Sequence, residues 1–401
     1  MFDALDGAGV RWSLLRPPES LNGRDGDIDV LVEPRAVGHV RELLVAQGFV
    51  PLPRGGPDLH AVDYDGASDR FLWLHLQSEL RVAGDTIAAR TVLDTVQRDP
   101  LPRPSDPWLL WIVLLHGLVD KRAVAERHRP ALVRLAGASD VRECPLADLA
   151  CRRGLDADVV LELVAAGDWP GLARLPVRDA IEPGPSAGAL ARVRAGGAAR
   201  RVRELWARRG ILVAVIGPDG AGKTTLVNGL DDALPFATRI LYMGLTGGRL
   251  PRADALRIPG LVLAARLMIL WVRYGVGRYH CARGRIVLFD RYALDGTVPS
   301  GDATLGPLAR VSRRVQSAAC PQPDLVLLLD ASGETMYRRK GEYDGARLET
   351  WRTAYSRLRR SVDGLAVLDA ERPADAVRRE ALALVWGCYS KRWRAPSAPR
   401  R

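Results

Sequence analysis

The chain has few cysteines for its length, and nothing in their spacing links them. Five occur among 401 residues, with no Cys-x-x-Cys pair and no Cys/His spacing typical of zinc. They are Cys144, Cys151, Cys281, Cys320 and Cys388. Scattered cysteines in odd number are typical of a reducing compartment, and they give no reason to expect disulfides or a structural zinc site.

The sequence also lacks a long apolar run and a signal sequence. The two most apolar runs, residues 108–119 and 261–272, are shorter than the roughly 20 residues that a bilayer requires. The N-terminus has neither a basic start nor an apolar core, so it does not resemble a signal peptide. We therefore expect no membrane span and a cytoplasmic location.

Lysine is scarce, although the chain is basic. It occurs only four times, so arginine supplies nearly all of the positive charge behind the net charge of +11 and the pI of about 9.8. A basic excess can indicate a nucleic-acid partner. The abundance of arginine together with alanine, valine, glycine and aspartate is more typical of genomic composition bias, and we therefore do not expect a nucleic-acid partner.

The most informative stretch is residues 211–226, ILVAVIGPDGAGKTTL. It predicts a buried strand, a glycine-rich turn and a helix that begins near Lys223, which is the context required for a G-x-x-x-x-G-K-[ST] phosphate-binding loop, or Walker A motif. The predicted nucleotide-binding residues are Gly217, Pro218, Asp219, Gly220, Ala221, Gly222, Lys223, Thr224 and Thr225.

The residue types of this loop suit a nucleoside triphosphate. Glycines allow successive backbone N–H groups to curl around the phosphates, and the following helix offers its unpaired N-terminal N–H groups. Lys223 is placed to reach the β- and γ-phosphates, and the hydroxyl of Thr224 is placed to bind Mg²⁺. The loop therefore predicts ATP and Mg²⁺ as cofactors.

Two later strands are predicted to end beside the loop. RIVLFDRY, residues 285–292, ends with Asp290 and Arg291, and PDLVLLLD, residues 323–330, ends with Asp330. Ligands of parallel α/β sheets bind outside the carboxyl ends of the strands, so these side chains are expected at the edge where the loop lies. For Asp330, capping of the next helix is an equally good interpretation.

Four stretches in this order, GPDGAGKTT, FDRY, PDLVLLLD and YRRKGEYDGAR, identify residues 211 to about 386 as a member of the thymidylate kinase superfamily. The resemblance implies an α/β P-loop kinase domain with a parallel sheet. Because thymidylate kinases are commonly dimers, it also implies a homodimer. It also implies roles: Asp219 near the sugar of an acceptor nucleotide, Asp290 near the metal and the acceptor, and Arg291 on the phosphates. The resemblance further implies a mobile lid around residues 338–340. The implied catalytic residues are Lys223, Asp290, Arg291, Arg338 and Arg339.

One stretch departs from this family. After the predicted strand at residues 240–243, a thymidylate kinase is expected to carry Arg-Glu-Pro-Gly-Gly, which helps to hold the monophosphate, whereas this chain has MGLTGGRLPR. The sequence therefore predicts a kinase but does not support thymidylate as the acceptor.

The N-terminal part predicts strands at residues 10–15, 27–32, 61–64 and 70–76, with a helix at 36–47. Asp27 and Asp29 alternate along the second strand, which places both carboxylates on one face, and such a pair can hold Mg²⁺ for nucleotidyl transfer. The stretch resembles the nucleotidyltransferase superfamily and implies a small α+β domain of that kind.

This second match is partial. Leu-Leu-Arg-Pro replaces the usual Gly-Ser, and the third carboxylate is expected within FLWLHLQ, where the chain has His75 and Gln77. The carboxylates considered as substitutes are Asp63, Asp65 and Glu79. An active transferase, a degenerate binding relative and turn acids without a role are all open interpretations.

Residues 105–180 predict a helical connector. Ser-Asp-Pro at 105–107 predicts a helix start, and the helix is expected to run to about residue 129, with shorter helices at 130–136, 145–152 and 157–165. His116, Asp120, Lys121 and His128 lie on the long helix at roughly helical spacing. Solvated charges with a satisfied histidine are the favoured interpretation, and a polar stripe that faces the N-terminal domain is the alternative.

The sequence thus predicts five segments. They are a nucleotidyltransferase-like domain (1–104), a helical domain (105–180), a linker and basic helix (181–209), a P-loop kinase domain (210–389) and a disordered tail (390–401). The predicted function is ATP- and Mg²⁺-dependent phosphoryl transfer to a small acceptor, for which a nucleoside monophosphate is one candidate. The alternatives are a bifunctional enzyme with nucleotidyl transfer at Asp27 and Asp29, and a non-catalytic regulator controlled by a nucleotide.

Overall fold

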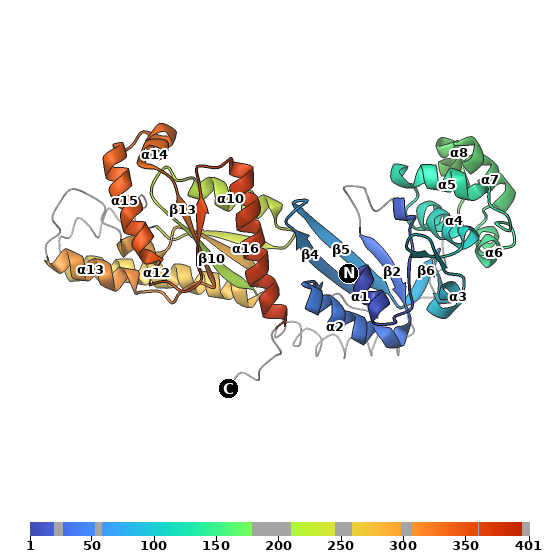
Figure 1. The fold of residues 1–401 in the computed structure, drawn as a ribbon, viewed down its shortest axis with the longest axis horizontal. Helices are drawn as coiled ribbons and strands as arrows, with labels where there is room; N and C mark the ends of the chain where they lie inside the picture. Colours follow the sequence, from blue (N-terminus) through green and yellow to red (C-terminus); the bar gives the residue numbers. More distant parts are fainter. Residues whose placement is uncertain are drawn as a thin grey trace. The chain divides into compact units, whose positions relative to one another are not determined.

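The computed structural model describes residues 1–19, 27–52, 58–178, 210–244, 259–297, 307–359 and 361–394 (Figure 1). They form two units, an N-terminal one made mainly of the residues up to 178 and a C-terminal one made mainly of those from 210 onward. The predicted linker and basic helix lie outside the described residues, and so do residues 395–401 of the predicted tail. The first residues of that tail, 390–394, form the end of the helix Ala374–Arg394. The five predicted segment boundaries remain predictions.

The C-terminal unit contains a five-stranded, all-parallel sheet in the order β11-β12-β10-β13-β14. Its strands are β10 (Ile211–Ile216), β11 (Thr238–Tyr242), β12 (Ile286–Asp290), β13 (Leu325–Asp330) and β14 (Leu365–Asp369). Every residue of β10 and β12 is buried, as expected for apolar strands covered on both faces. The central β10 therefore delivers the glycine-rich turn to the middle of the carboxyl edge.

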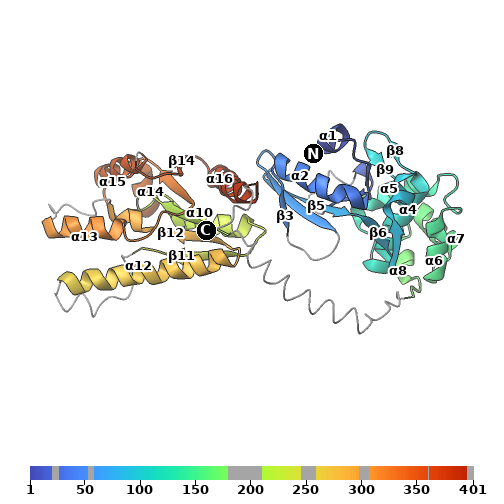
Figure 2. The same ribbon diagram turned by 90° about the horizontal axis from the view of Figure 1, so that it is seen from below.

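Helices cover both faces of this sheet, with α12 along one face and α10 and α16 along the other (Figure 2). The helices are α10 (Lys223–Ala233), α12 (Pro259–Ala282), α13 (Pro307–Ser317), α14 (Gly333–Lys340), α15 (Gly345–Leu358) and α16 (Ala374–Arg394), with a 3₁₀ turn η5 (Ala293–Thr297) after β12. Helix α12 approaches β12 closely at Gly277, where an added Cβ would lie 2.5 Å from the ring of Phe289. This mixed α/β arrangement is consistent with the predicted P-loop kinase domain.

The N-terminal unit contains a mixed sheet in the order β1-β2-β5-β4-β3. The strands are β1 (Trp12–Leu14), β2 (Ile28–Val32), β3 (Val50–Leu52), β4 (Leu59–Asp65) and β5 (Arg70–Gln77), with helices α1 (Phe2–Gly7), η2 (Pro34–Ala36) and α2 (Val37–Gln47). Strand β2 pairs in parallel with β5, and this register sets Asp29 opposite His75. Asp27 directly precedes the first residue of β2, and Asp29 is the second residue of this strand.

Short elements connect this sheet to the helical part. They are β6 (Glu79–Val82), β7 (Asp85–Ala88), α3 (Ala89–Leu93), β8 (Gln97–Arg98) and β9 (Pro102–Arg103), followed by α4 (Asp106–Leu115), η3 (His116–Asp120), η4 (Glu126–His128), α5 (Arg129–Ala136), α6 (Pro145–Arg152), α7 (Ala157–Ala166) and α8 (Trp169–Arg174). One hydrophobic cluster joins Leu15 and Leu31 of the strand region to Trp111 and Leu132 of the helices. The helices therefore share a core with the sheet.

The prediction of one helix from residue 105 to about 129 is wrong. Helix α4 ends at Leu115, a π-helical turn follows, and Arg122 adopts a left-handed backbone with φ 58°. The chain folds back tightly here, because a Cβ at Gly117 would lie 3.1 Å from Cγ2 of Val124. The polar residues at 116, 120, 121 and 128 consequently line a cavity instead of one helical stripe.

None of the helices in the described ranges combines the length and the apolar character needed to span a membrane.

Candidate active site

The glycine-rich turn after β10 requires glycine at particular positions. Gly217, Gly220 and Gly222 have φ values of 147°, 88° and 96°, a region that side chains disfavour. At Gly220 an added Cβ would also lie 2.5 Å from the carbonyl oxygen of Met336. The local sequence thus sets the path of the loop, and helix α10 begins directly after it at Lys223.

Lys223 is buried against the loop. Its side chain is only 6% exposed, and Nζ donates to the carbonyl oxygens of Gly217 and Pro218 at 2.8 and 2.7 Å. Burial, together with the nearby Arg291, lowers the pKa of this ammonium group. The loop therefore contains one enclosed cation, which Asp219 approaches at 3.4 Å.

Thr224 and Asp290 meet at the start of α10. The hydroxyl Oγ1 of Thr224 donates to Oδ2 of Asp290 at 2.8 Å, and Asp290 is 8% exposed at the end of β12. A hydroxyl and a carboxylate are hard oxygen ligands of the kind that Mg²⁺ prefers, with phosphate oxygens and water completing its shell. These two residues fit the predicted metal.

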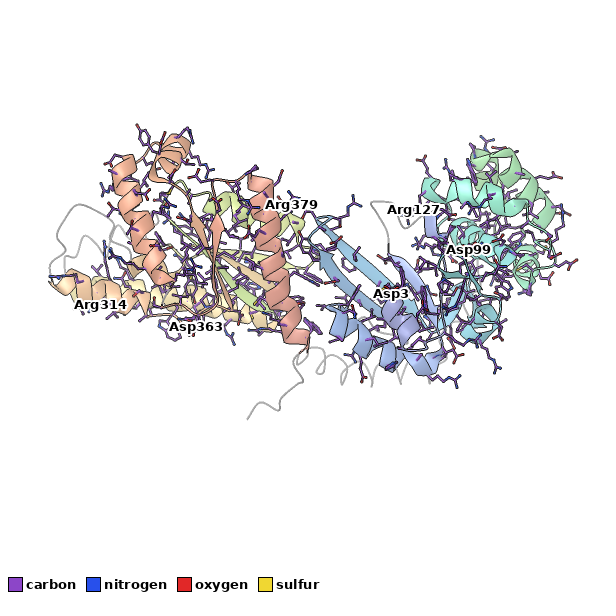
Figure 3. The ribbon with its side chains drawn as sticks, in the orientation of Figure 1. Asp3, Asp99, Arg127, Arg314, Asp363 and Arg379 are labelled. Carbon is purple, nitrogen blue, oxygen red and sulfur yellow. The ribbon has the colours of Figure 1, made fainter. Side chains whose placement is uncertain are left out.

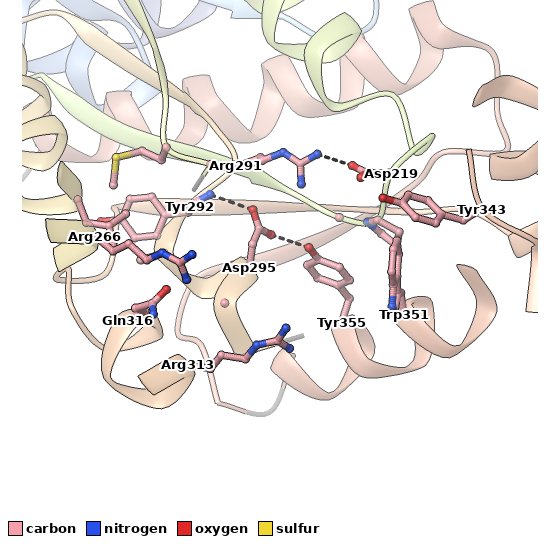
Figure 4. A pocket seen from close by; sticks show the side chains of 17 residues that line it. Asp219, Arg266, Arg291, Tyr292, Asp295, Arg313, Gln316, Tyr343, Trp351 and Tyr355 are labelled. Carbon is pink, nitrogen blue, oxygen red and sulfur yellow. Dashed lines mark hydrogen bonds and ion pairs between the residues drawn. The ribbon is translucent and has the colours of Figure 1, made fainter. Parts of the chain in front are cut away.

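Arg291 follows Asp290 in a strained conformation. Its φ is 70°, which is uncommon for a residue with a side chain, and its N–H donates to the carbonyl oxygen of Val215 at 3.0 Å. Its guanidinium donates to the carboxylate of Asp219 within the loop (Figure 4). The fold therefore holds an arginine beside the phosphate-binding loop.

A cavity of about 260 Å³ begins at this ion pair and is lined by Gly217, Pro218 and Asp219 of the loop. Its other walls are aromatic and cationic (Figure 4). The aromatic residues are Tyr292, Tyr343, Trp351 and Tyr355, and the arginines are Arg266, Arg291 and Arg313. Such walls suit a ligand that carries both a planar ring and an anionic group.

Asp295 lies in the middle of this cavity. Its Oδ1 accepts from the hydroxyl of Tyr355 at 2.7 Å, and its Oδ2 accepts from the backbone N–H of Tyr292 at 3.1 Å (Figure 4). Burial raises the pKa of this carboxyl group, and the nearby Lys223 offsets only part of the rise. Asp295 stands in the 3₁₀ turn η5 that follows β12.

A second cavity, of about 310 Å³, lies on the other side of the loop. It is lined by Ala221, Gly222 and Thr225, together with Arg339 and the turn after β14. The loop thus contributes its first residues to one cavity and its later residues to another. This arrangement can hold two ligands that meet at the loop.

The three cations predicted for a lid lie on or at the end of α14. Arg339 donates to the carbonyl oxygen of Ala370 at 2.9 Å, whereas Arg338 donates to the hydroxyl of Thr335 at 3.1 Å. Lys340 pairs with Glu342 at 2.9 Å. Only Arg339 of these lines a cavity described above.

Asp330 does reach the carboxyl edge, but its carboxylate is already engaged. Arg352 of α15 donates to both of its oxygens, at 2.6 and 3.0 Å. This bidentate pair fixes α15, which carries Trp351 and Tyr355 into the first cavity. Asp330 therefore positions the wall of the site.

Glu371 anchors the N-terminus of α14, and we predict a pH-dependent contribution to stability. Its carboxylate accepts from the N–H of Ser332 at 2.6 Å and the hydroxyl of Thr335 at 2.8 Å, which lowers its pKa to about 2. A lowered pKa stabilises the fold above the ordinary value of 4.5, and this contribution disappears as the pH falls toward 2. Glu371→Gln should lower Tm by about 2–4 °C at pH 7.

Thermal melts between pH 3 and pH 7 measure this effect, and the loss in Tm should shrink toward the acid end. Asp363→Asn serves as the control, because Asp363 is an exposed carboxylate of the same unit (Figure 3). A Tm loss that is constant across this pH range would contradict the assignment.

Asp27 and Asp29 lie together in the N-terminal unit, on a separate cavity. Asp29 is bound by the guanidinium of Arg16 and by Nδ1 of His75 at 3.0 Å. Burial opposes ionisation of Asp29, but these partners outweigh it and lower the pKa. The sequence did not indicate Asp58, whose Oδ2 lies 3.7 Å from Nε2 of His75.

In the described ranges, no group of three or more His, Cys, Asp or Glu side chains is arranged to hold a metal ion. The metal role of Asp27 and Asp29 remains a prediction. The substitutes considered for the third carboxylate, residues 63, 65 and 79, do not line this cavity.

The parallel sheet, the loop and the two cavities define the C-terminal unit as a P-loop kinase-like domain. Comparison with known proteins agrees, although no protein-family model matches the chain. The chain is 32% identical to a thymidylate kinase of Xanthomonas euvesicatoria pv. vesicatoria over 200 residues, which cover 46% of this chain and 86% of the relative.

Two further thymidylate kinases give the same result. That of Xanthomonas oryzae pv. oryzae is 32% identical over 207 residues, covering 47% of this chain and 89% of the relative. That of Xanthomonas campestris pv. campestris is 32% identical over 209 residues, covering 46% of this chain and 87% of the relative. The chain belongs to the thymidylate kinase family, and more than half of it lies outside the match.

Proposed function

We propose that the C-terminal unit transfers the γ-phosphoryl group of ATP, with Mg²⁺, to a small acceptor bound in the cavity of Figure 4. The observation that carries this proposal is the position of the loop between two cavities. The donor nucleotide would occupy the cavity beside Thr225, and the acceptor would occupy the aromatic cavity beside Asp219. Membership of the thymidylate kinase family supports the same assignment.

A nucleoside monophosphate fits the aromatic cavity best. Its base can stack on the tyrosine and tryptophan rings, and its phosphate can bind the guanidinium groups of Arg266, Arg291 or Arg313. Thymidylate is the acceptor named for the relatives. Which base this chain accepts is decided by the cavity around Asp295, a buried carboxylate that can accept a hydrogen bond from a ligand.

Catalysis at this site is positioning and charge neutralisation. Lys223 and the N–H groups of the loop hold the donor phosphates, and Arg291 with the lid arginines Arg338 and Arg339 offsets charge on the transferring group. Thr224 and Asp290 would hold Mg²⁺, which neutralises phosphate charge when bound. If the acceptor were a hydroxyl, Asp290 or Asp219 would take its proton.

Incubation with γ-labelled ATP, Mg²⁺ and a panel of nucleoside monophosphates, nucleosides and sugars tests this proposal. Label that moves to one acceptor identifies both the activity and the substrate. ATP binding without transfer to any acceptor would instead favour the non-catalytic, nucleotide-controlled regulator. A nucleic-acid partner would show affinity that falls steeply with salt.

The second enzymatic alternative, nucleotidyl transfer at Asp27 and Asp29, has less support. Two metal ions bound at this pair would have to displace Arg16 and His75 from Asp29. Since these cations already neutralise the carboxylate, the geometry favours binding of a ligand over metal-assisted transfer.

We also infer that α12 mediates homodimer formation, and predict that Trp271→Glu yields a monomer. Apolar side chains are exposed along one stripe of this helix at i, i+3, i+4, i+8 and i+11. They are Met268, Trp271, Val272, Val276 and Tyr279. Trp271, at 54% exposed, would be covered by a second copy, and a buried glutamate there would oppose association.

Sedimentation analysis measures this directly, with a wild-type mass expected at twice the 43.8 kDa of the chain. The matched control is Val159→Glu, which places the same charge at an exposed apolar position on α7. A monomeric wild-type chain at micromolar concentration, or a variant that remains dimeric, would refute the role of α12.

The cytoplasmic location remains a prediction.

A further inference from the structure

The N-terminal unit encloses a cavity that the proposed kinase reaction does not use. Its volume is about 730 Å³, within the range of pockets that enclose small organic ligands. Strands β2, β5 and β6, helix α4 and residues 120–128 all contribute to its lining. Because every lining residue lies between Leu15 and His128, the cavity belongs wholly to this unit.

Part of the lining is apolar and suits the face of a ring. The side chains of Leu80 and Val82 on β6, Ile112 and Val113 on α4, and Val124 after the π-helical turn all line the cavity. Four of these five are also part of the buried core of the unit. They therefore form a firm surface on which the carbon atoms of a ligand can pack.

The polar part of the lining is a chain of alternating charges. Asp29 contacts Arg16 and Nδ1 of His75, and Asp58 contacts Arg81 at 2.9 Å and Nε2 of His75 at 3.7 Å. The carboxylates of Asp29 and Asp58 therefore already face cations. Such a lining has little excess charge to offer a multiply charged ligand, but it presents many donors and acceptors to uncharged groups.

Two buried polar atoms of this lining have no hydrogen-bond partner within the described residues. They are Nδ1 of His128 and Oδ1 of Asp58. His128 is 6% exposed, and its Nε2 accepts from Nε of Arg127 at 3.4 Å, so Nδ1 carries the proton and is a donor. Burial and the neighbouring Arg16 and Arg127 lower the pKa of His128 to about 4, which keeps the ring neutral at pH 7.

We propose that this cavity binds an uncharged ring polyol, either a saccharide or the sugar of a nucleoside. A hydroxyl group both donates and accepts, so hydroxyls of one ligand can satisfy Oδ1 of Asp58 and Nδ1 of His128. The carbon face of the ring would pack on Ile112 and Val124. A buried donor and a buried acceptor left without partners are costly, and a ligand that satisfies both removes that cost.

Isothermal titration of the full-length chain tests this proposal with two sets of probes. One set is adenosine, cytidine, guanosine, uridine and thymidine, and the other is sucrose, trehalose and maltose. At least one probe should bind, and the set to which it belongs distinguishes the two sources of the polyol. His128→Phe, which removes the donor at similar size, should weaken that binding at least tenfold.

Two more variants make the result specific. Asp58→Asn should also weaken binding of the probe. If thermal melts show that His128→Phe does not fold, the comparison of Asp58→Asn with the wild type tests the proposal. Tyr343→Ala, in the aromatic cavity of the C-terminal unit, should leave the affinity unchanged, because a probe whose ring stacks in that cavity would respond to it.

Three outcomes would overturn the proposal. The first is that no probe of either set binds at millimolar concentration. The second is binding that neither His128→Phe nor Asp58→Asn alters. The third is binding of a nucleoside triphosphate with Mn²⁺ that depends on Asp29 and releases pyrophosphate, which would make the cavity a nucleotidyl-transfer site.

Discussion

Replacing Lys223 by alanine is expected to lower the rate of phosphoryl transfer by about a hundredfold to a thousandfold. Lys223 is the enclosed cation of the loop, and its ammonium group lies against the carbonyl oxygens of Gly217 and Pro218. Alanine removes the charge that would offset the donor phosphates, and none of the described residues that line the two kinase cavities is a lysine that could replace it. Steady-state kinetics with saturating ATP would report the loss in kcat.

Two controls distinguish an effect of the lost charge on the rate from an effect of misfolding. Lys391→Ala removes an exposed lysine near the end of α16 and should leave the rate within about twofold of the wild type. Thermal melts of Lys223→Ala should show a folded protein at the assay temperature, so that the loss in rate reports the loss of the charge. A variant that retains more than a third of the wild-type rate would exclude Lys223 from the reaction.

Asp290→Asn should have the second largest effect, a loss of about a hundredfold in rate with a raised requirement for Mg²⁺. Asparagine has nearly the same shape and can still accept from the hydroxyl of Thr224, so the loop should keep its geometry. The negative charge that would hold the metal is lost. Rates measured over a Mg²⁺ titration separate this loss from a defect in nucleotide binding.

The neighbouring strand supplies the matched control. Asp330 also ends a buried strand at the carboxyl edge, but Arg352 engages both of its oxygens. Asp330→Asn should therefore reduce stability and leave the Mg²⁺ dependence unchanged. An Asp290→Asn enzyme with the same Mg²⁺ dependence as the wild type would remove Asp290 from the metal site.

The residues near the loop were predictable because they are local in sequence. The spacing of Gly217, Gly222, Lys223 and Thr224 sets a strand, a turn and a helix within 16 residues, and β10 and α10 lie where this pattern placed them. The apolar run before Asp290 likewise predicted its position at a strand end.

The walls of the aromatic cavity were not predictable in this way. Trp351 and Tyr355 follow the loop by more than 100 residues, and the pair of Asp330 with Arg352 fixes the helix α15 that carries them. Their helix has no motif of its own. The N-terminal cavity arises similarly, since it depends on the tight turn at Gly117, which an apolar helical pattern concealed.

Transfer of label from γ-labelled ATP to nucleoside monophosphates in the presence of Mg²⁺ tests the proposed kinase activity most directly. ATP binding would be measured on the same preparation. We predict a labelled nucleoside diphosphate from at least one acceptor, and no such product from Lys223→Ala. Tight ATP binding with no labelled product from any acceptor would contradict this prediction and would assign the loop a regulatory role.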